Sequence, residues 1–476
     1  MSELPKKEGN FFEWYNEVLE RSQVTDKRYP VKGLNVWPPF GLSIRSLFDQ
    51  TLRNAVGPIG YQEVSFPTLI PETELKKESE HIKGFEAEVY WVTRGGNTPL
   101  DINLCLRPTS ETAMYPMFAL WVRSHKDLPL RTFQICNVFR YETKSTRPLL
   151  RIREIHFYEG HTVHPTEESA TRQVQEDLGS FEQVARSFAL PYLINKRPEW
   201  DKFPGAHYSL GLDIPFGDAR TLQVGTVHHY RDNFAKPYGI QYETEDGKTA
   251  FGHQTTYGIS ERLIGGVVGV HGDEKGLVLP PALAPVQVAI VPVPGKGSKE
   301  AVEGAARALG STLSAGGLRV KVDLSEDRPG AKYYAWESRG VPLRIELGPR
   351  EVEEKAATLA DRFGKKRKVP QAELLSEVRA ELESFLTTLA DRAQARFRDA
   401  IARAKELSDL KGPKAVYLIG WCGKEACGHK VEEVVEGGLL GTIEGGSPAD
   451  IVQGEAPPCI VCGSGPSRWA AAGRPI

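Results

Sequence analysis

The first 280 residues combine apolar positions at helical spacing with apolar positions that alternate as in a strand. Helices are predicted for residues 41–56, 109–125 and 166–188. The segment GYQEVSFPTLIP, residues 60–71, alternates as a strand that Pro67 ends, because proline cannot donate to a strand ladder. No clear linker interrupts this stretch, so a single region of mixed helices and strands is predicted.

A second alternating stretch, NVFRYETKSTRPLLRIREIHFYEG at residues 137–160, predicts two strands joined by a loop. Alternation places Arg140 and Glu142 on one face of the first strand, and Arg151 and Arg153 on one face of the second. Five cations stand against two acids between Arg140 and Glu154. The cations of such a hairpin either lie on a solvated surface and pair with nearby acids, or their guanidinium groups together bind a polyphosphate.

The pattern changes after GLVLPPALAP, residues 276–285, where three prolines in ten residues indicate a linker. Short strand-like and helix-like segments then alternate as far as LRIEL at 343–347, which is typical of a small α/β domain. A long helix rich in Ala, Leu, Glu and Arg is predicted for residues 372–408. Three domains are therefore predicted, over residues 1–280, 285–390 and 400–476.

Four of the six cysteines gather in the last 55 residues. They form two close pairs, Cys422 with Cys427 and Cys459 with Cys462. Two such pairs suit a closed Zn²⁺ site of four thiolates, which leaves no position for a substrate and is therefore structural. Free thiols or disulfides are the alternative. Cys105 and Cys136 lie in apolar strand-like runs and are predicted to be buried thiols.

Composition adds little to this picture. Lys+Arg 60 balance Asp+Glu 62 for a formal net charge of −2, so any basic surface for a nucleic acid must be local. The N-terminal residues contain no apolar signal-peptide core, and nowhere do 18 consecutive residues stay apolar. No membrane association is predicted, and the expected compartment is the cytoplasm.

Three segments resemble the three motifs of the class II aminoacyl-tRNA synthetases. VFRYE, a loop and RIREIHFYEGHT resemble motif 2, which forms a hairpin over ATP. GYQEVSFPTLIP resembles motif 1, and YGISERLIGGVVGVHGDEKGLVLPP resembles motif 3 with Arg262 near the start of its helix. The segments occur in the family's order, which favours the polyphosphate-binding interpretation of the hairpin.

Further segments narrow the resemblance to the prolyl-tRNA synthetases. These are RPTSETAMY, QVGTVHHYRDNFAKPYGI and DRPGAKYYAWESRGVPLRIELGPRE. The chain is similar to the eukaryote- and archaeon-like form, because only about a hundred residues separate Glu159 from Arg262 and leave no room for the editing insertion of bacterial-type enzymes. The resemblance implies an α/β fold: an antiparallel class II sheet with helices, an α/β anticodon-binding domain and a small zinc-binding domain.

The resemblance also implies an activity, which is ATP-dependent attachment of L-proline to tRNA(Pro) through prolyl-adenylate, with Mg²⁺ accompanying ATP, by a homodimer. The implied ATP-binding residues are Arg140, Glu142, Arg151, Gln223, Thr226, Ser260 and Arg262. The implied proline-binding residues are Thr109, Glu111, Arg140, His161 and His228, with Arg140 and Arg262 catalytic. Glu337 and Arg344 fall where the family reads anticodon bases, and the basic run GKKRK at 364–368 is either solvated surface or an RNA contact.

Two positions depart from the family pattern. Ser260 stands where threonine is common, and Ile476 ends the chain where bacterial members often end in tyrosine. Three alternatives stay open: a synthetase for threonine, serine or glycine, an inactive RNA-binding paralogue, and an oxidoreductase that binds a dinucleotide at residues 285–350. The segments RPTSETAMY and GTVHHY count against a synthetase for another amino acid. The presence of all the motif arginines counts against an inactive paralogue. The third glycine of a dinucleotide-binding loop is missing after GKGSKE, which counts against an oxidoreductase.

Overall fold

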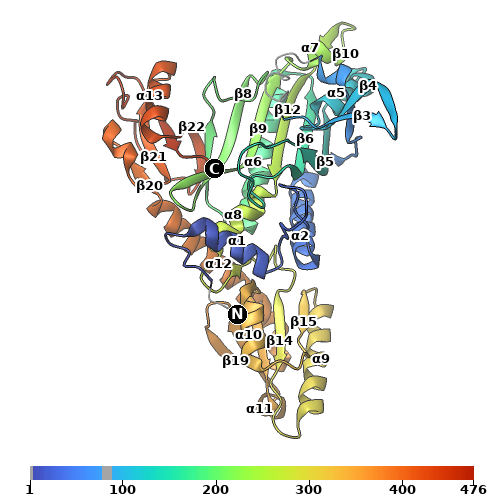
Figure 1. The fold of residues 1–476 in the computed structure, drawn as a ribbon, viewed down its shortest axis with the longest axis vertical. Helices are drawn as coiled ribbons and strands as arrows, with labels where there is room; N and C mark the ends of the chain where they lie inside the picture. Colours follow the sequence, from blue (N-terminus) through green and yellow to red (C-terminus); the bar gives the residue numbers. More distant parts are fainter. Residues whose placement is uncertain (1–3, 78–87) are drawn as a thin grey trace.

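The computed structural model describes residues 4–77 and 88–476. Its centre is an 11-stranded sheet in the order β1-β5-β6-β12-β9-β8-β7-β22-β23-β21-β20 (Figure 1). The first seven strands in this order are β1 (Gln62–Glu63), β5 (Leu130–Phe139), β6 (Glu154–His164), β12 (His253–Ser260), β9 (Arg220–Arg231), β8 (Tyr208–Phe216) and β7 (Tyr192–Lys196). The last four are β22 (Gly438–Ser447), β23 (Arg468–Gly473), β21 (Val416–Trp421) and β20 (Ile401–Arg403). From β5 to β23 all neighbouring strands run antiparallel.

Four helices pack with the sheet into one apolar core. They are α1 (Phe11–Arg21), α2 (Pro39–Val56), α6 (Glu167–Ser187) and α8 (Arg262–His271). The helices predicted over 41–56 and 166–188 are confirmed. Thr166 begins α6 by accepting a hydrogen bond from the Ser169 N–H, which satisfies one of the free donors at a helix start.

The strand predicted to begin at residue 60 and end at Pro67 is shorter than predicted. Between residues 60 and 71 only Gln62–Glu63 (β1) and Leu69–Pro71 (β2) are strands, and the chain changes sheets between them, at Pro67, which cannot donate to a ladder. β2 pairs with β4 (Thr98–Leu106) in a separate sheet completed by β3 (Trp91–Gly95). The helix predicted over 109–125 is shorter, since α5 covers Glu111–Trp121.

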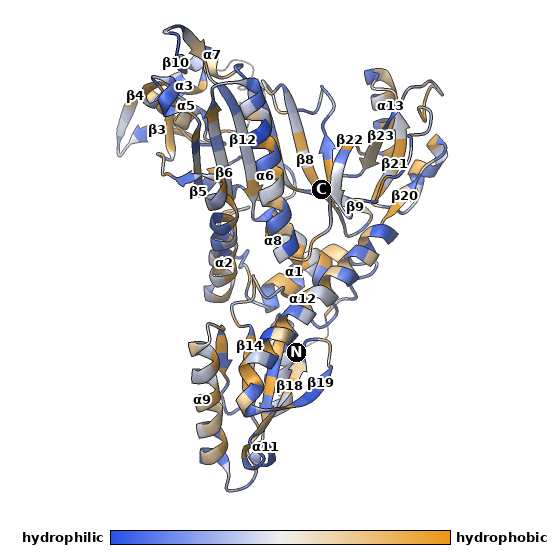
Figure 2. Ribbon diagram, turned by 180° about the vertical axis from the view of Figure 1, so that it is seen from behind, coloured by the Kyte–Doolittle hydropathy of each residue, from blue (hydrophilic) through white to orange (hydrophobic). Residues whose placement is uncertain are grey.

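A five-stranded sheet in the order β15-β14-β17-β18-β19 lies apart from the main sheet, and α12 (Leu374–Asp399) lies between the two in both views (Figures 1 and 2). Its strands are β14 (Val288–Pro292), β15 (Val320–Val322), β17 (Leu343–Leu347), β18 (Ala356–Asp361) and β19 (Lys366–Pro370). Its helices include α9 (Lys299–Ala315), α10 (Pro329–Ser338) and α11 (Pro349–Glu353). The predicted alternation of strands and helices is therefore confirmed. The long helix ends earlier than predicted, because Ile401–Arg403 leaves it to pair with β21.

The C-terminal strands continue the main sheet. β22 pairs antiparallel with β7, from Thr442 with Lys196 to Ser447 with Tyr192. The tail that carries the four cysteines is thereby joined to the central strands by backbone hydrogen bonds. In the described ranges no helix is both long and apolar enough to cross a membrane.

Asp177 of α6 is a carboxyl group buried within this core. Tyr61 Oη and Gln173 Nε2 both donate to its Oδ1 at 2.9 Å, and Oδ2 has no hydrogen-bond partner among the described residues. Burial raises the pKa of Asp177 to about 7. The folded protein therefore binds a proton that the unfolded chain, with an ordinary pKa of about 4, releases as pH rises.

This carboxyl group should make stability fall as pH rises from about 4 to about 7, because the folded state binds more protons there than the unfolded state. Asp177→Asn removes the titration. We expect the free energy of unfolding of the variant, relative to wild type, to rise by about 2 kcal/mol between about pH 5 and about pH 8. Urea unfolding of both proteins at the two pH values measures this, and an equal difference at both would contradict it.

Candidate active site

The arginine-rich stretch forms a loop and not a continuation of the strands. β5 ends at Phe139 and β6 begins at Glu154, so the prediction that Arg140, Glu142, Arg151 and Arg153 lie on strand faces was wrong. The Arg140 N–H still donates to the Arg153 carbonyl at 2.9 Å. Beyond that pair, the chain folds into a turn in which the Arg147 N–H donates to the Arg151 carbonyl at 2.7 Å.

Segments from the N-terminal region hold this loop in place. The guanidinium of Arg147 lies 3.4 Å from the centre of the Phe12 ring, and the Arg153 N–H donates to the Gly33 carbonyl at 2.8 Å. Gly33 has φ of +81°, a conformation that favours glycine, and its missing side chain leaves room for Arg153. These contacts join residues more than a hundred positions apart, so alternation along the loop itself could not show them.

Three arginines gather where the loop meets the start of α8. The side chain of Arg262 donates through Nε to the Leu150 carbonyl at 2.7 Å. Burial, with Arg140 and Arg151 close by, lowers the pKa of Arg262 to about 10. Burial also lowers the pKa of Arg140. The like charges destabilise one another here, and a bound polyanion would relieve their repulsion.

Glu142 forms an ion pair within this cluster. Its Oε2 lies 2.9 Å from Nε of Arg151. The resemblance places Glu142 near the adenine amino group, which remains a prediction. Glu142 therefore pairs with one of the three guanidinium groups, and Glu88, Glu111 and Glu159 also act on the charge of Arg140.

Thr109 and Glu111 lie buried just before and at the start of α5. The Thr109 hydroxyl donates to Oε2 of Glu111, and the Tyr230 hydroxyl donates to its Oε1 at 3.2 Å. Glu111 also contributes to the electrostatic environment of Arg140. The structure therefore places one buried carboxylate beside the cationic cluster.

His161 and His228 lie in neighbouring parts of the same sheet. His161 is fully buried on β6, and its Nδ1 lies 3.2 Å from the Tyr115 hydroxyl. His228 on β9 pairs through Nδ1 with the Ser209 hydroxyl at 2.7 Å. Its ring stacks on Phe203, with 4.7 Å between ring centres.

The residues predicted for the adenosine side lie on β9 and at the end of β12. Thr226 Oγ1 donates to the Leu210 carbonyl at 3.2 Å, and Gln223 Nε2 to the Gly225 carbonyl at 3.4 Å. The Ser260 hydroxyl accepts from the Arg262 N–H at 3.3 Å. Ser260 therefore stands next to the cationic cluster, where its hydroxyl fixes the backbone that carries Arg262.

Several polar groups that complete this region were not predicted from the sequence. Tyr115 and Tyr230 are two of them, and their hydroxyls contact His161 and Glu111, respectively. Glu159 was assigned no role in the site, yet it is fully buried between Ser110 and His161. The signal that could have identified Glu159 is an acid in the middle of an apolar strand, because such residues are rarely buried without a partner.

The four C-terminal cysteines converge. Cys422 follows β21, Cys427 lies in α13 (Glu425–Val435), and Cys459 and Cys462 lie between β22 and β23. Their sulfur atoms all lie within 4.8 Å of one another. The Sγ atoms of Cys462 and Cys422 are 3.9 Å apart, close to the ~3.8 Å edge of a tetrahedron with Zn–S bonds of about 2.3 Å. The donor set therefore fits Zn²⁺.

His429 stands apart from the cysteine group, since its ring pairs with Glu425 and Glu432. Cys105 and Cys136 are free thiols. Cys105 is fully buried, as predicted, whereas Cys136 is only partly buried.

Glu337 and Arg344 come together on the five-stranded unit. Arg344 Nη1 lies 3.1 Å from Oε1 of Glu337, and Arg344 Nη2 lies 2.9 Å from Glu346. The Arg344 guanidinium also covers the Tyr333 ring at 4.0 Å from its centre. A carboxylate and a guanidinium that could meet a base are therefore preorganised next to an aromatic ring.

The basic run at 364–368 is paired with acids. Lys365, Lys366, Arg367 and Lys368 form ion pairs with Glu381, Glu346, Glu377 and Glu354, respectively. These ion pairs neutralise much of the positive charge of the run, so it is a weaker candidate for RNA contact than its amino-acid composition indicates.

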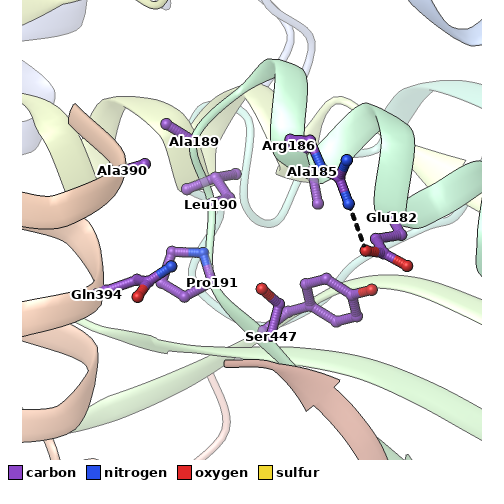
Figure 3. Close-up of a pocket in the computed structure, with 10 residues that line it drawn as sticks. Glu182, Ala185, Arg186, Ala189, Leu190, Pro191, Ala390, Gln394 and Ser447 are labelled. Atoms are coloured by element: carbon purple, nitrogen blue, oxygen red, sulfur yellow. Dashed lines mark hydrogen bonds and ion pairs between the residues drawn. The ribbon is translucent and has the colours of Figure 1, made fainter. Parts of the chain in front are cut away.

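A small pocket between α6, α12 and Ser447 is lined by none of these residues (Figure 3). It encloses about 150 Å³, and Glu182 and Arg186 pair across its edge in the close-up. None of its lining residues was predicted to bind a substrate. Its volume falls below the range of about 300–1,000 Å³ that is typical of ligand sites.

Comparison with known families defines the class. Residues 90–271 match the family described as tRNA synthetase class II core domain (G, H, P, S and T), and residues 287–381 match the family described as anticodon binding domain. The sheet, the arginine cluster and these two matches define a class II aminoacyl-tRNA synthetase.

Individual relatives narrow the family. The chain is 52% identical over 467 residues to the proline–tRNA ligase of Thermococcus kodakarensis, covering 97% of each chain. It is 50% identical over 469 residues to that of Pyrococcus abyssi, again covering 97% of each. The chain belongs to the proline–tRNA ligase family.

Solved structures agree with this family. Giardia lamblia prolyl-tRNA synthetase in complex with prolyl-adenylate superimposes with a TM-score of 0.94 at 32% identity, covering 100% of each chain. The enzyme from Cryptosporidium parvum complexed with halofuginone and AMPPNP gives 0.91 at 31% identity, covering 100% of this chain and 97% of that one. The predicted family and its archaeon- and eukaryote-like form are confirmed.

Proposed function

We propose that this protein activates L-proline with ATP, forms prolyl-adenylate with release of pyrophosphate, and transfers the prolyl group to tRNA(Pro). The observation that carries the proposal is the cluster of Arg140, Arg151 and Arg262 beside the buried carboxylate of Glu111. The cluster supplies charge for a triphosphate, and the carboxylate supplies charge for an ammonium group. ATP and an amino acid carry these two groups.

The first step mainly requires that proline and ATP be positioned relative to each other. The carboxylate of proline is ionised at neutral pH, so it can attack the α-phosphate without a base from the protein. A secondary ammonium held by Glu111 and Thr109 would direct that carboxylate toward Arg140. Arg140 would then neutralise charge on both the carboxylate and the α-phosphate as they approach.

The remaining residues take roles around these two groups. Arg151 and Arg262 bind the outer phosphates of ATP, which enters with Mg²⁺. Glu142 accepts a hydrogen bond from the adenine amino group. Gln223, Thr226 and Ser260 line the adenosine side, while His161 and His228 complete the proline pocket. Pyrophosphate leaves from the side of the cluster that holds the outer phosphates.

The rest of the chain supports this chemistry. We propose a catalytic domain over residues 1–280, an anticodon-binding domain over 285–390 and a C-terminal domain over 400–476 in which Cys422, Cys427, Cys459 and Cys462 hold a structural Zn²⁺. The enzyme acts as a homodimer in the cytoplasm. Support comes from the shared family and from the four-sulfur geometry.

Direct aminoacylation tests the proposed function. Purified protein with ATP and Mg²⁺ should attach radiolabelled proline to a transcript of tRNA(Pro) and leave a transcript with a different anticodon and acceptor stem unlabelled. If prolyl-adenylate forms but tRNA(Pro) is not labelled, the proposed transfer step is contradicted. If neither prolyl-adenylate nor labelled tRNA(Pro) forms, the proposed function is contradicted.

Glu337→Gln should weaken tRNA use without affecting amino-acid activation. The amide cannot accept from two donors of a guanine edge, so kcat/KM for tRNA(Pro) should fall about 10- to 100-fold. The rate of proline-dependent pyrophosphate exchange, which needs no tRNA, should stay within about twofold of wild type. Both assays are run on one preparation, and an unchanged kcat/KM for tRNA would contradict the anticodon role.

A further inference from the structure

Glu159 lies between two parts of the proposed proline site that are distant in the chain. It stands on β6 and is fully buried, two positions before His161. Tyr158 belongs to the apolar core, so alternation directs Glu159 and His161 toward the opposite face of the sheet. The loop with Thr109 and Glu111 meets Glu159 just before α5, through the hydrogen bonds of Ser110.

Both oxygens of Glu159 accept hydrogen bonds. Oε2 accepts from the Ser110 N–H at 3.2 Å, and Oε1 accepts from the Ser110 hydroxyl. Oε1 also accepts from Gln134 Nε2 and from the Cys136 thiol, each at 3.3 Å. Ser110 lies between Thr109 and Glu111, so this one carboxylate fixes the residue that links the two proposed ammonium ligands.

The same carboxylate contacts the proposed pocket histidine. Oε2 of Glu159 lies 3.4 Å from Nε2 of His161. Burial disfavours the ionised form of Glu159, but hydrogen bonds from His161, Ser110 and Cys136 outweigh it and hold its pKa below the ordinary value. An ionised carboxylate only accepts hydrogen bonds, so Nε2 of His161 is the donor in this contact, while Nδ1 of the same ring lies 3.2 Å from the Tyr115 hydroxyl.

We propose that Glu159 is the positioning residue of the amino-acid site: it holds the Thr109–Glu111 loop and the His161 ring in one fixed geometry through Ser110 and Nε2. The proposal rests on the proposed function, because it takes Glu111 and His161 as ligands of proline. Glu159 itself has its acceptor sites filled by protein donors and does not bind the substrate.

A metal ion is the competing role for this group. The ligand atoms of Glu111, Glu159 and His161 all lie within 4.8 Å of one another. Protein donors already occupy the oxygens of Glu159, and Glu111 accepts from Thr109 and Tyr230. The hydrogen bonds favour positioning over metal binding.

Glu159→Gln tests the proposal, because glutamine keeps the size but presents an NH₂ group to one set of donors. In proline-dependent pyrophosphate exchange, we expect the KM for proline to rise about 10- to 100-fold while the KM for ATP stays within about threefold. The double variant Ser110→Ala with Glu159→Gln should raise the KM for proline little beyond Glu159→Gln alone, because both changes break one contact.

Asp177→Asn is the matched control, since it also replaces a buried carboxylate by an amide, while the hydrogen bonds of the Asp177 side chain in the described part of the chain go to Tyr61 and Gln173 and not to Ser110 or His161. It should leave the KM for proline unchanged. If the KM of Glu159→Gln for proline equals that of wild type, the positioning role is overturned. It is also overturned if the variant only has fewer active sites, counted by an adenylate burst, with unchanged kinetics at each site. A second metal ion seen by native mass spectrometry in wild type and Asp177→Asn, but lost in Glu159→Gln, would overturn it in favour of a metal site. If wild type itself shows no proline-dependent exchange, the proposed function fails instead.

Discussion

Arg140→Ala is expected to lower proline-dependent pyrophosphate exchange about a thousandfold or more. Arg140 is the cation that the structure places among the acids of the loop, the Glu111 carboxylate and Arg262. Removing a charged group that is proposed to contact both reacting partners should cost about 4 kcal/mol of transition-state stabilisation. Initial rates of exchange at saturating ATP and proline measure the loss.

Lys144→Ala is the control for this variant. Lys144 lies in the same loop, but its side chain is exposed and has no proposed role in the reaction. Exchange should stay within about fivefold of wild type, since no reacting group is lost. An Arg140→Ala enzyme as active as the Lys144→Ala enzyme would show that Arg140 takes no part in the reaction.

Cys459→Ser should abolish zinc binding and lower the melting temperature by about 10 °C. Cys459 is buried among the four sulfur atoms, and a site with three thiolates binds zinc much more weakly. Loss of the ion loosens the segment between β22 and β23, and β22 pairs directly with β7. A loss of about 2 kcal/mol corresponds to a shift of about this size in a domain of 60–100 residues, the size of the proposed domain over 400–476.

Cys105→Ser separates zinc loss from the loss of any buried thiol. Cys105 is fully buried but far in the chain from the other four. Native mass spectrometry should find one zinc ion in wild type and Cys105→Ser, and none in Cys459→Ser. Fully reduced wild-type protein without metal would contradict the zinc site.

Local sequence patterns predicted much of the fold. The helical spacing over 41–56 and 166–188 and the alternation over 285–347 depend on short-range burial, and the structure contains those elements. The cysteine pairs were also predictable, because two close pairs need only one long-range approach to form a four-sulfur site.

Long-range contacts decided what the sequence could not predict. Arg140 to Arg153 alternate as strands do, yet Gly33 and Phe12 from the N-terminal region hold them as a loop. The pairing of β22 with β7 joins residues about 250 positions apart, which no local pattern records. Resemblance supplied Thr109, Glu111 and His161, but the carboxylate that links them became visible only in the folded chain.

The most direct measurement is exchange of pyrophosphate into ATP, run with each of the twenty amino acids on purified protein with Mg²⁺. Proline should give the highest rate. Alanine or cysteine should give weak signals, because a pocket discriminates against a missing methylene by only about 1–3 kcal/mol. A highest rate with another amino acid would refute the proline pocket, and no exchange with any amino acid would refute the proposed chemistry.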